Sequence, residues 1–288
     1  MPKFVYQLME VLYTALEVRN LTARLKNEAG RLGFVPTMGA LHEGHLELVR
    51  QAKSENSVVV CSIFVNPAQF NNPEDLERYP RTLEKDSELL RSVGCDILFV
   101  PSVMEMYPSP LDLRIDFGML ETVMEGAFRP GHFNGVGIVV AKLFNIVQPD
   151  RAYFGQKDLQ QTAIIKSLIR NLSYPVELRI CPTVREPDGL AMSSRNVRLT
   201  PEERKLAPEI YRILTECKMS LQKNTPVKQA IEDALAEFAR LPAFRTEYLE
   251  LADTATLTPA DTLRAEGNNA LCVAVRLGKV RLIDNLVF

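Results

Sequence analysis

Two of the chain's three histidines stand in one tetrapeptide, His42-Glu43-Gly44-His45. The tetrapeptide follows a short apolar run at 32–35 and a turn at 36–41, and it precedes an amphipathic stretch at 46–53. A strand, a turn and a helix start in this order leave free backbone N–H groups and the positive end of the helix dipole facing one point. Two imidazoles three residues apart, with a glycine between them, would face the same ligand. The segment therefore predicts a phosphate-binding site, and a nucleoside triphosphate is the expected ligand.

A metal site is a weaker interpretation of the same histidines. The zinc-protease pattern places its histidines four residues apart with a glutamate between them, and this pair is one residue short. The third histidine, His132, lies in the segment 129–133, with no cysteine or carboxylate at metal-ligand spacing. A lone histidine is more often structural than catalytic, whereas a pair within one turn favours a function.

Length, composition and charge limit the classes of protein that fit. The 288 residues allow one large domain or two unequal ones. Apolar residues make up 46% and charged residues 24% of the chain, as in an ordinary globular protein. Because the formal net charge is only −2, nucleic acid is not expected as the main partner.

The cysteines and the apolar runs predict a cytoplasmic protein with no membrane partner. The five cysteines are scattered, odd in number and never spaced as C-x-x-C, which fits reduced thiols rather than disulfides. Residues 4–16 read as an amphipathic helix and not as a signal peptide. The best candidate span, 136–147, is interrupted by Lys142 and Asn145 and is too short to cross a bilayer.

Between residues 31 and 180, short β-rich runs alternate with helical patterns. The expected strands are 31–35, 57–65, 96–100, 151–154 and 176–181, and the expected helices are 45–56, 82–93, 136–147 and 158–172. The run 58–65 is apolar almost throughout, which is typical of a parallel strand covered on both faces. The alternation predicts a doubly wound, Rossmann-like α/β domain that binds ligands at the carboxyl ends of its strands.

The pattern changes after residue 184. Segment 185–196 begins with turn residues, and Thr200-Pro201-Glu202-Glu203 has the cap, proline and glutamate of a helix start. A second helix is expected over 226–241, and strands over 246–251, 270–277 and 280–283, with Gly278-Lys279 as a hairpin turn. The apolar stripe of that helix should comprise Val227, Ile231, Leu235 and Phe238. We therefore predict two domains, residues 1–183 and a smaller α+β domain of residues 184–288.

Five polar clusters fall at strand ends or in loops of this arrangement. They are 36–45, 64–70, 125–133, 154–161 and 192–196. Taken singly, each has a plain structural explanation: Asn66-Pro67 could be only a turn, and Ser193-Ser194 only a polar linker. Their joint occurrence at successive strand ends favours one shared site.

Nucleotidyl transfer is a chemistry that needs such a set. Attack on an α-phosphate builds negative charge on that phosphate and on the departing pyrophosphate, so fixed donors are required. The candidate donors are His42, His45, Lys157, Ser193, Ser194 and Arg195. Asp86 or Asp158 could place a magnesium ion, because magnesium prefers oxygen ligands and phosphates. Imidazoles at a helix N-terminus tend to stay neutral and can act as neutral donors.

The motifs resemble those of the pantothenate synthetase (pantoate–β-alanine ligase) family over nearly the whole chain. The strings that carry the resemblance are F-V-P-T-M-G-A-L-H-E-G-H, S-I-F-V-N-P-A-Q-F, Y-P-R-T-L-E-K-D, R-P-G-H-F-N-G-V, Q-P-D-R-A-Y-F-G-Q-K-D-L-Q-Q and D-G-L-A-M-S-S-R-N. The first and last are similar to the H-I-G-H and K-M-S-K-S signatures of a wider adenylate-forming nucleotidyltransferase superfamily. The whole set in this order is specific to the family.

The resemblance implies a cytoplasmic, homodimeric ligase that uses ATP and Mg²⁺. (R)-pantoate would be activated to pantoyl adenylate with loss of pyrophosphate, and β-alanine would then attack the acyl carbon to give pantothenate and AMP. The catalytic residues would be His45, His42, Lys157 and Arg195. The residues assigned to ATP would be Met38, Gly39, Ala40, Leu41, His42, Glu43, Gly44, His45, Gly155, Gln156, Lys157, Asp158, Val184, Met192, Ser193, Ser194 and Arg195.

The resemblance also assigns the other substrates. Gln69 would bind pantoate and β-alanine, and Gln161 would bind pantoate. Of the two carboxylates suited to magnesium by its ligand preference, Asp86 is the predicted magnesium residue. Neutral amides bind hydroxyls and a carboxylate without strong charge, which leaves that carboxylate nucleophilic. Gln156 departs from the family pattern, which has glutamate there; the change is isosteric and keeps Lys157, so activity is still expected.

Two alternatives stay open on the sequence. Another small-molecule nucleotidyltransferase of the superfamily would keep both nucleotide signatures but would not need the pair Gln69 and Gln161. A regulatory module that only binds nucleotide would not need the full donor set. The domain junction at 185–196 is expected to close over ATP because of its glycine, serine and aspartate content.

Overall fold

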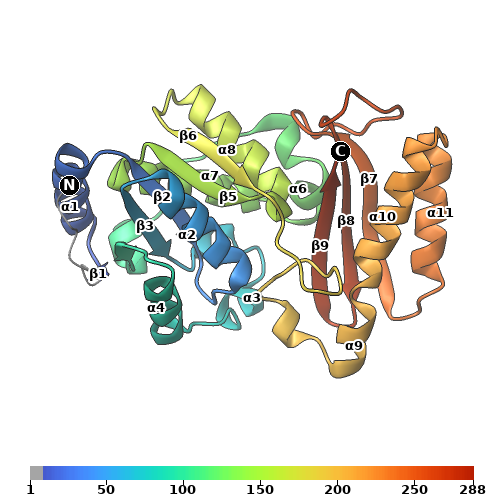
Figure 1. Ribbon diagram of the computed structural model, residues 1–288, viewed down its shortest axis with the longest axis horizontal. Helices are drawn as coiled ribbons and strands as arrows, with labels where there is room; N and C mark the ends of the chain where they lie inside the picture. The colour runs from blue at the N-terminus through green and yellow to red at the C-terminus, as the bar shows by residue number, and fades with distance from the viewer. Residues whose placement is uncertain (1–8) are drawn as a thin grey trace.

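The computed structural model describes residues 9–288 and places their strands in two separate sheets (Figure 1). The sheet built from the first two thirds of the chain has six strands, and the sheet near residue 288 has three. Figure 1 shows the two sheets side by side, with α6 (Met124–Phe128) lying close to the smaller one. The site described below is formed where they meet.

Every strand of the larger sheet runs parallel to its neighbours. The strands are β1 (Glu10–Leu12), β2 (Leu32–Thr37), β3 (Val58–Ile63), β4 (Ile97–Phe99), β5 (Arg151–Gly155) and β6 (Glu177–Cys181), in the order β1-β4-β3-β2-β5-β6. From β2 the chain builds first toward β4 and later, through β5, in the other direction. The strand order therefore switches between β2 and β5, which is where open α/β sheets bind ligands.

Helices cover both faces of this sheet. On one face α1 (Ala15–Ala29), α7 (His132–Val147) and α8 (Leu159–Asn171) pack on the sheet. On the other face lie α2 (Glu43–Glu55) and α4 (Leu83–Ser92). All six residues of β3 are buried, which explains the apolar run from which a doubly covered strand was predicted. The predicted Rossmann-like class is confirmed.

Short elements connect these layers. They are α3 (Pro73–Glu77), α5 (Val103–Met106) and the 3₁₀ turns η1 (Pro67–Gln69), η2 (Gly118–Glu121), η3 (Gln156–Asp158) and η4 (Asn196–Arg198).

The smaller sheet is antiparallel, with β7 (Phe244–Asp253), β8 (Asn269–Leu277) and β9 (Val280–Val287) in that order. The helices α10 (Glu209–Gln222) and α11 (Val227–Ala239) share its core. The short α9 (Pro201–Leu206) starts with the predicted capping box, in which Thr200 and Glu203 bond each other's backbone amides. The boundary predicted at 183/184 falls in the connection between the two sheets and stays a prediction.

Three expectations about single elements were wrong. Within the predicted helix 4–16, Glu10–Leu12 form a strand because they pair with β4; residues 4–8 lie outside the described range. Neither α1 nor α10 was predicted as a separate element, and the helix expected to start at Thr200 ends at Leu206. On α11 the small residues Ala230 and Ala234 are buried beside Phe238, whereas Leu235 is exposed, so the stripe is centred one residue earlier than expected.

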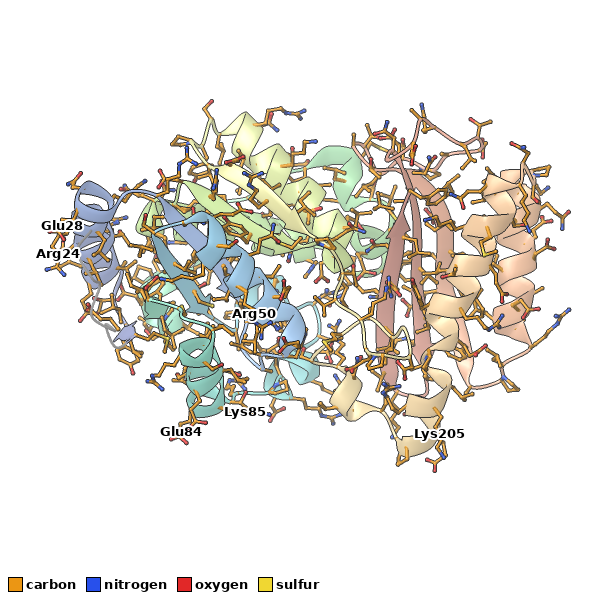
Figure 2. All side chains as sticks on the ribbon, viewed as in Figure 1. Arg24, Glu28, Arg50, Glu84, Lys85 and Lys205 are labelled. Carbon is orange, nitrogen blue, oxygen red and sulfur yellow. The ribbon has the colours of Figure 1, made fainter. Side chains whose placement is uncertain are left out.

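Charges of both signs surround the molecule. Figure 2 shows the labelled side chains of Glu28, Glu84, Arg24 and Lys205 projecting outward from their helices. All five cysteines are free and buried. Within residues 9–288 no helix combines the length and apolar character that a bilayer span requires.

A buried ion pair ties the two sheets together. Arg281 on β9 donates to both carboxylate oxygens of Glu125 on α6, at 2.6 and 2.7 Å, and to Glu247 on β7 at 2.6 Å. The hydroxyl of Tyr248 also donates to Glu125, at 2.9 Å. The side chains of Arg281 and Glu125 are only 13% and 11% exposed. Removing one partner would therefore leave an uncompensated buried charge.

We expect Arg281→Met to lower the free energy of unfolding by about 3–5 kcal/mol, because the buried Glu125 would lose its ion-pair partner. The matched control is Arg276→Met. Arg276 also bonds Glu247 but is 48% exposed, so its loss should cost under about 1 kcal/mol. Denaturant unfolding of both variants measures the difference; equal losses would show that the Arg281 pair does not join the sheets energetically.

Candidate active site

Two connected cavities lie where β2 and β5 end. The apolar cavity, about 180 Å³, is lined by side chains of α7 such as Val139 and Leu143 together with Gln69. The loop cavity, about 170 Å³, is lined by Lys157, Val184 and the segment 192–195. Residues that line both cavities include Met38, His45, Asp158, Gln161 and Arg195. A ligand in one cavity therefore meets a ligand in the other at these shared side chains.

The two histidines of the tetrapeptide cap the start of α2. The Nδ1 atom of His42 accepts from the amide of Gly44 at 3.2 Å, and the Nδ1 atom of His45 accepts from the amide of His42 at 3.3 Å. The ring centroids are 4.1 Å apart. A Cβ at position 44 would come within 2.9 Å of the His42 ring, so only glycine lets that ring fold over the helix start.

These bonds fix where each ring carries its proton. A nitrogen that accepts a hydrogen bond holds no proton, so a neutral ring must carry its proton on Nε2. Burial lowers the pKa of His45 to about 3, with the neighbouring His42 adding to the effect. Burial and the charge of Lys157 lower the pKa of His42 to about 4. Both rings are therefore neutral N–H donors at physiological pH.

The expectation of free backbone N–H groups at this turn was wrong for four of its amides. The amides of Ala40 and Leu41 donate to the carboxylate of Asp86, each at 2.9 Å, and the amides of His42 and Gly44 donate to the two rings. The protein satisfies these donors itself. An anion at this point would therefore be met by imidazole and not by these amides.

Asp86 is a part of the turn. Its side chain is 1% exposed, and besides the two amides it accepts from the hydroxyl of Thr82 at 3.2 Å. Gly39 adopts φ +81° beside it, and a Cβ there would lie 3.2 Å from the carboxylate. These contacts account for both oxygens of Asp86, and its predicted contact with magnesium stays untested. Within residues 9–288, no three histidine, cysteine or acidic side chains cluster in a way that could hold a metal ion.

Gln69 is held in the wall of the apolar cavity by Asn66. The side-chain amide of Asn66 donates to Gln69 Oε1 at 3.1 Å and to the carbonyl of Gly135 at 3.1 Å. The Tyr107 hydroxyl donates to the other end of Asn66 at 2.8 Å. The Gln69 amide group thus keeps its nitrogen toward the cavity, within 2.9 Å of the Met38 sulfur. The turn at Asn66-Pro67 could have been only structural. In the structure it positions the side chain of Gln69 in the cavity wall.

Asn285, on the last strand of the smaller sheet, holds the lysine turn. Its amide nitrogen donates to the carbonyls of Gln156 and Lys157, at 2.9 and 2.8 Å. Gln156 Nε2 lies 3.4 Å from Asn285 Oδ1, so this residue faces the neighbouring strand. The adjacent Asp284 is buried and forms a two-point ion pair with Arg185, at 2.6 and 2.9 Å. Sequence reasoning missed these contacts because they join segments more than 90 residues apart.

Most of the predicted nucleotide residues lie around the loop cavity. They are Met38, His42, Gly44, His45, Gly155, Lys157, Asp158, Val184, Met192, Ser193, Ser194 and Arg195. The remaining five, Gly39, Ala40, Leu41, Glu43 and Gln156, do not line it. Leu41 is buried beneath the turn and Glu43 pairs with Arg50 on the surface. Gln69 and Gln161 both line the apolar cavity, as a shared ligand would require.

Three further residues face these cavities, although sequence reasoning assigned no role to them. Tyr79 lines both cavities. Arg129 and His132 line the apolar cavity. Arg129 and His132 belong to the polar cluster 125–133. The sequence signal that could have identified them is the charged residue Arg129 next to the loop corner Pro130-Gly131.

Comparisons with known proteins identify relatives of this chain. The family model described as pantoate-beta-alanine ligase matches residues 10–287. A pantothenate synthetase from Cytophaga hutchinsonii is 46% identical over 275 residues, which is 94% of this chain and 96% of that protein. The crystal structure of pantothenate synthetase from Thermus thermophilus has a TM-score of 0.90 and 48% identity, covering 97% of this chain and 99% of the other. A pantoate-beta-alanine ligase from Francisella tularensis, complexed with β,γ-ATP and β-alanine, has a TM-score of 0.81 and 36% identity, covering 97% of both chains.

We expect none of the three histidines to titrate above pH 5. Burial lowers the pKa of His132 to about 4, and those of His42 and His45 to about 4 and 3. NMR titration of the imidazole C–H signals measures all three values directly. A midpoint near the ordinary 6.5 for His42 or His45 in the folded protein would contradict the neutral-donor assignment.

The lowered pKa values of the histidines also make the free energy of unfolding depend on pH. An unfolded chain binds protons on these rings below about pH 6.5, while the folded protein does not until about pH 4. Histidine protonation therefore lowers stability as the pH falls from 6.5. His45→Gln should flatten this part of the dependence of the unfolding free energy on pH; an identical slope in the variant would contradict the assignment.

We expect Asp86→Asn to lower the free energy of unfolding by about 1–3 kcal/mol, because asparagine has one acceptor oxygen where two amides need one each. The loss should be the same with and without Mg²⁺. The control is Glu88→Gln on the same helix, which is exposed. A Mg²⁺-dependent stabilisation of the wild type that Asp86→Asn abolishes would instead make Asp86 a magnesium ligand.

Proposed function

This chain belongs to the pantoate–β-alanine ligase family, whose members are ATP-dependent ligases of pantothenate biosynthesis, and we propose a two-step reaction for it. Its substrates would be joined through a pantoyl adenylate. ATP would occupy the loop cavity and pantoate the apolar cavity. The observation that carries this proposal is that His45, Asp158, Gln161 and Arg195 line both cavities. The carboxylate of one substrate can thus meet the α-phosphorus of the other.

In the first step a pantoate carboxylate oxygen attacks the α-phosphorus of ATP. A P–O bond forms to the acyl group, and the bond between the α-phosphorus and the bridging oxygen breaks, releasing pyrophosphate. Gln69 and Gln161 would hold pantoate by its hydroxyls and carboxylate without neutralising the nucleophile. The aliphatic wall of Val139, Val140 and Leu143 suits the branched carbon chain of pantoate.

The donors around the loop cavity would stabilise the charge that develops in this step. The neutral Nε2–H groups of His42 and His45 need no protonation at physiological pH. Lys157, whose side chain is 17% exposed, and Arg195 would spread the phosphate charge. The hydroxyls of Ser193 and Ser194 complete the set. Because these donors are in place before the reaction, little reorganisation accompanies pyrophosphate departure.

In the second step the amine of β-alanine attacks the acyl carbon. A C–N bond forms, the bond from the acyl carbon to the AMP oxygen breaks, and the nitrogen gives up a proton to water. The products are pantothenate and AMP. The relative from Francisella tularensis has been crystallised with β,γ-ATP and β-alanine, which supports the proposal that one site takes both ligands.

Magnesium would enter with the triphosphate, and Asp158 is the carboxylate that fits it. The Asp158 side chain is 49% exposed and lines both cavities, whereas both oxygens of Asp86 already accept from amides. The ion would neutralise part of the phosphate charge.

Three finer features belong to the same proposal. The free, buried cysteines fit a reducing compartment, so we place the enzyme in the cytoplasm. By family membership it would be a homodimer.

Segment 185–196, at the junction of the two sheets, would close over bound ATP. Limited proteolysis within this segment should therefore slow when ATP and pantoate are added.

The test is pyrophosphate release by purified protein given ATP, Mg²⁺, (R)-pantoate and β-alanine, with each omitted in turn. Release that requires pantoate, with pantothenate formed only when β-alanine is present, is the expected result. Isotope exchange between pyrophosphate and ATP should require pantoate but not β-alanine. Exchange that requires a different small molecule would favour another nucleotidyltransferase of the superfamily, and ATP binding without turnover would favour a regulatory module.

We expect His45→Gln to reduce the rate of the pantoate-dependent exchange by about 100–1,000-fold, the typical effect of removing one transition-state donor. Glu47→Gln is the control, because Glu47 lies on the same helix and is exposed. A variant His45→Gln with near wild-type exchange would remove His45 from the proposed chemistry.

A further inference from the structure

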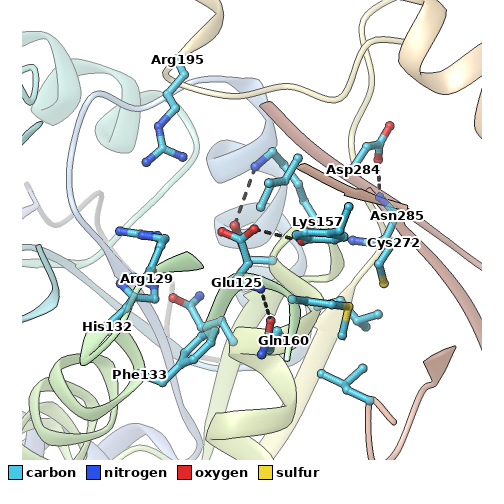
Figure 3. Close-up of a pocket in the computed structure, with 17 residues that line it drawn as sticks. Glu125, Arg129, His132, Phe133, Lys157, Gln160, Arg195, Cys272, Asp284 and Asn285 are labelled. Atoms are coloured by element: carbon cyan, nitrogen blue, oxygen red, sulfur yellow. Dashed lines mark hydrogen bonds and ion pairs between the residues drawn. The ribbon is translucent and has the colours of Figure 1, made fainter. Parts of the chain in front are cut away.

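A third cavity lies between the two sheets and opens onto the same site. At about 60 Å³ it is smaller than the other two, so it suits a small ligand and not a nucleotide. It shares His132, Asp158, Gln161 and Arg195 with the apolar cavity. Figure 3 shows its labelled residues, with Arg129 and Arg195 extending into the same space. A molecule in this cavity could reach the point where pantoate is activated.

The acids in its wall already have basic partners. Glu125 is paired with Arg281, and Asp284 with Arg185, in each case through two hydrogen bonds. Asp158 lies 3.7 Å from Lys157. Arg129 and Arg195, by contrast, form no ion pair with any acid of residues 9–288. Two guanidinium groups in the wall of the cavity therefore have no direct carboxylate partner.

Arg129 is oriented by a hydrogen-bond chain that reaches Gln69. The backbone carbonyl of Gln69 can only accept, so His132 Nδ1, at 2.8 Å, carries the ring proton. His132 Nε2 is then an acceptor, and one terminal nitrogen of Arg129 donates to it at 3.2 Å. Burial and the charge of Arg195 lower the pKa of Arg129 to about 10, so it stays charged at physiological pH. The other donors of its guanidinium remain available for a ligand.

We infer that Arg129, positioned by His132, binds the carboxylate of the amine substrate in the cavity between the two sheets. This inference rests on the proposed function. Arg129 lines the apolar and inter-sheet cavities but not the loop cavity, so it is separate from the phosphate donors. A guanidinium fork and a carboxylate form two parallel bonds, which fixes the direction of a short amino acid.

The chemistry of the second step explains why such an anchor is needed. β-Alanine is a small, flexible molecule whose only groups are an amine and a carboxylate two methylenes apart. Binding its carboxylate at Arg129 would leave the amine free to point at the acyl carbon held beside Gln69. Orientation of this kind converts an encounter of two molecules into attack within one complex.

The test separates the two half-reactions in Arg129→Gln. We expect the KM for β-alanine to rise by about 100-fold, as when a charged hydrogen-bonded pair is lost. Pantoate-dependent exchange between pyrophosphate and ATP should stay within about threefold of wild type, because it needs no amine. Arg129→Lys keeps the charge without the fork, so its KM for β-alanine should lie between those of the wild type and Arg129→Gln. Arg170→Gln, at an exposed position of α8, is the matched control.

A second readout distinguishes binding from a structural effect. n-Propylamine is β-alanine with a methyl group in place of the carboxylate. The ratio of kcat/KM for β-alanine to that for n-propylamine should fall by about 100-fold in Arg129→Gln. An unchanged ratio and an unchanged KM for β-alanine would overturn the inference, as would a raised KM for pantoate in the exchange reaction. Absence of exchange in the wild type would instead overturn the proposed function.

Discussion

The site depends on two hydrogen bonds that the rings of His42 and His45 accept from backbone amides at the start of α2. Because Nδ1 of each ring accepts from an amide, each Nε2 becomes a donor without acquiring a charge. The same bonds satisfy amides that a phosphate would otherwise have used. Asp86 satisfies the two preceding amides, so four amides of the turn are bonded by side chains of the protein itself. The chain thus replaces a backbone anion site with side-chain donors whose position and tautomer are set by folding.

The remaining parts of the site converge because of the strand order. Parallel strands end at one edge, and the switch between β2 and β5 opens a gap there into which α7 and α8 supply side chains. The smaller sheet closes that gap from the other side through Arg281 and Asn285. In the proposed function, uncharged amides would face pantoate, the donors would face phosphate, and the guanidinium of Arg129 would remain for the carboxylate of the amine substrate. Each substrate would then meet side chains of a different charge.

Local pattern was enough to predict five strands of the larger sheet, the covering helices α2, α4, α7 and α8, and the polar residues at the strand ends, but not α1 or β1. Alternating periodicity identified β2 to β6, and the spacing of His42 and His45 predicted a nucleotide site at the start of α2. What failed depended on partners distant in sequence. The segment Glu10–Leu12 is a strand only because β4 offers it an edge, and Asp86 turns inward because amides 45 residues away need an acceptor. Arg129 stood in a recognised cluster, but its lack of an acidic partner is visible only in three dimensions.

The hold of Asn285 on the lysine turn also sets an order of events during synthesis. Lys157 leaves the ribosome 128 residues before the side chain that fixes its carbonyl. A nascent chain that ends before β9 therefore lacks the two hydrogen bonds that hold the lysine turn. The position of Lys157 is completed only when the last strand of the chain has docked.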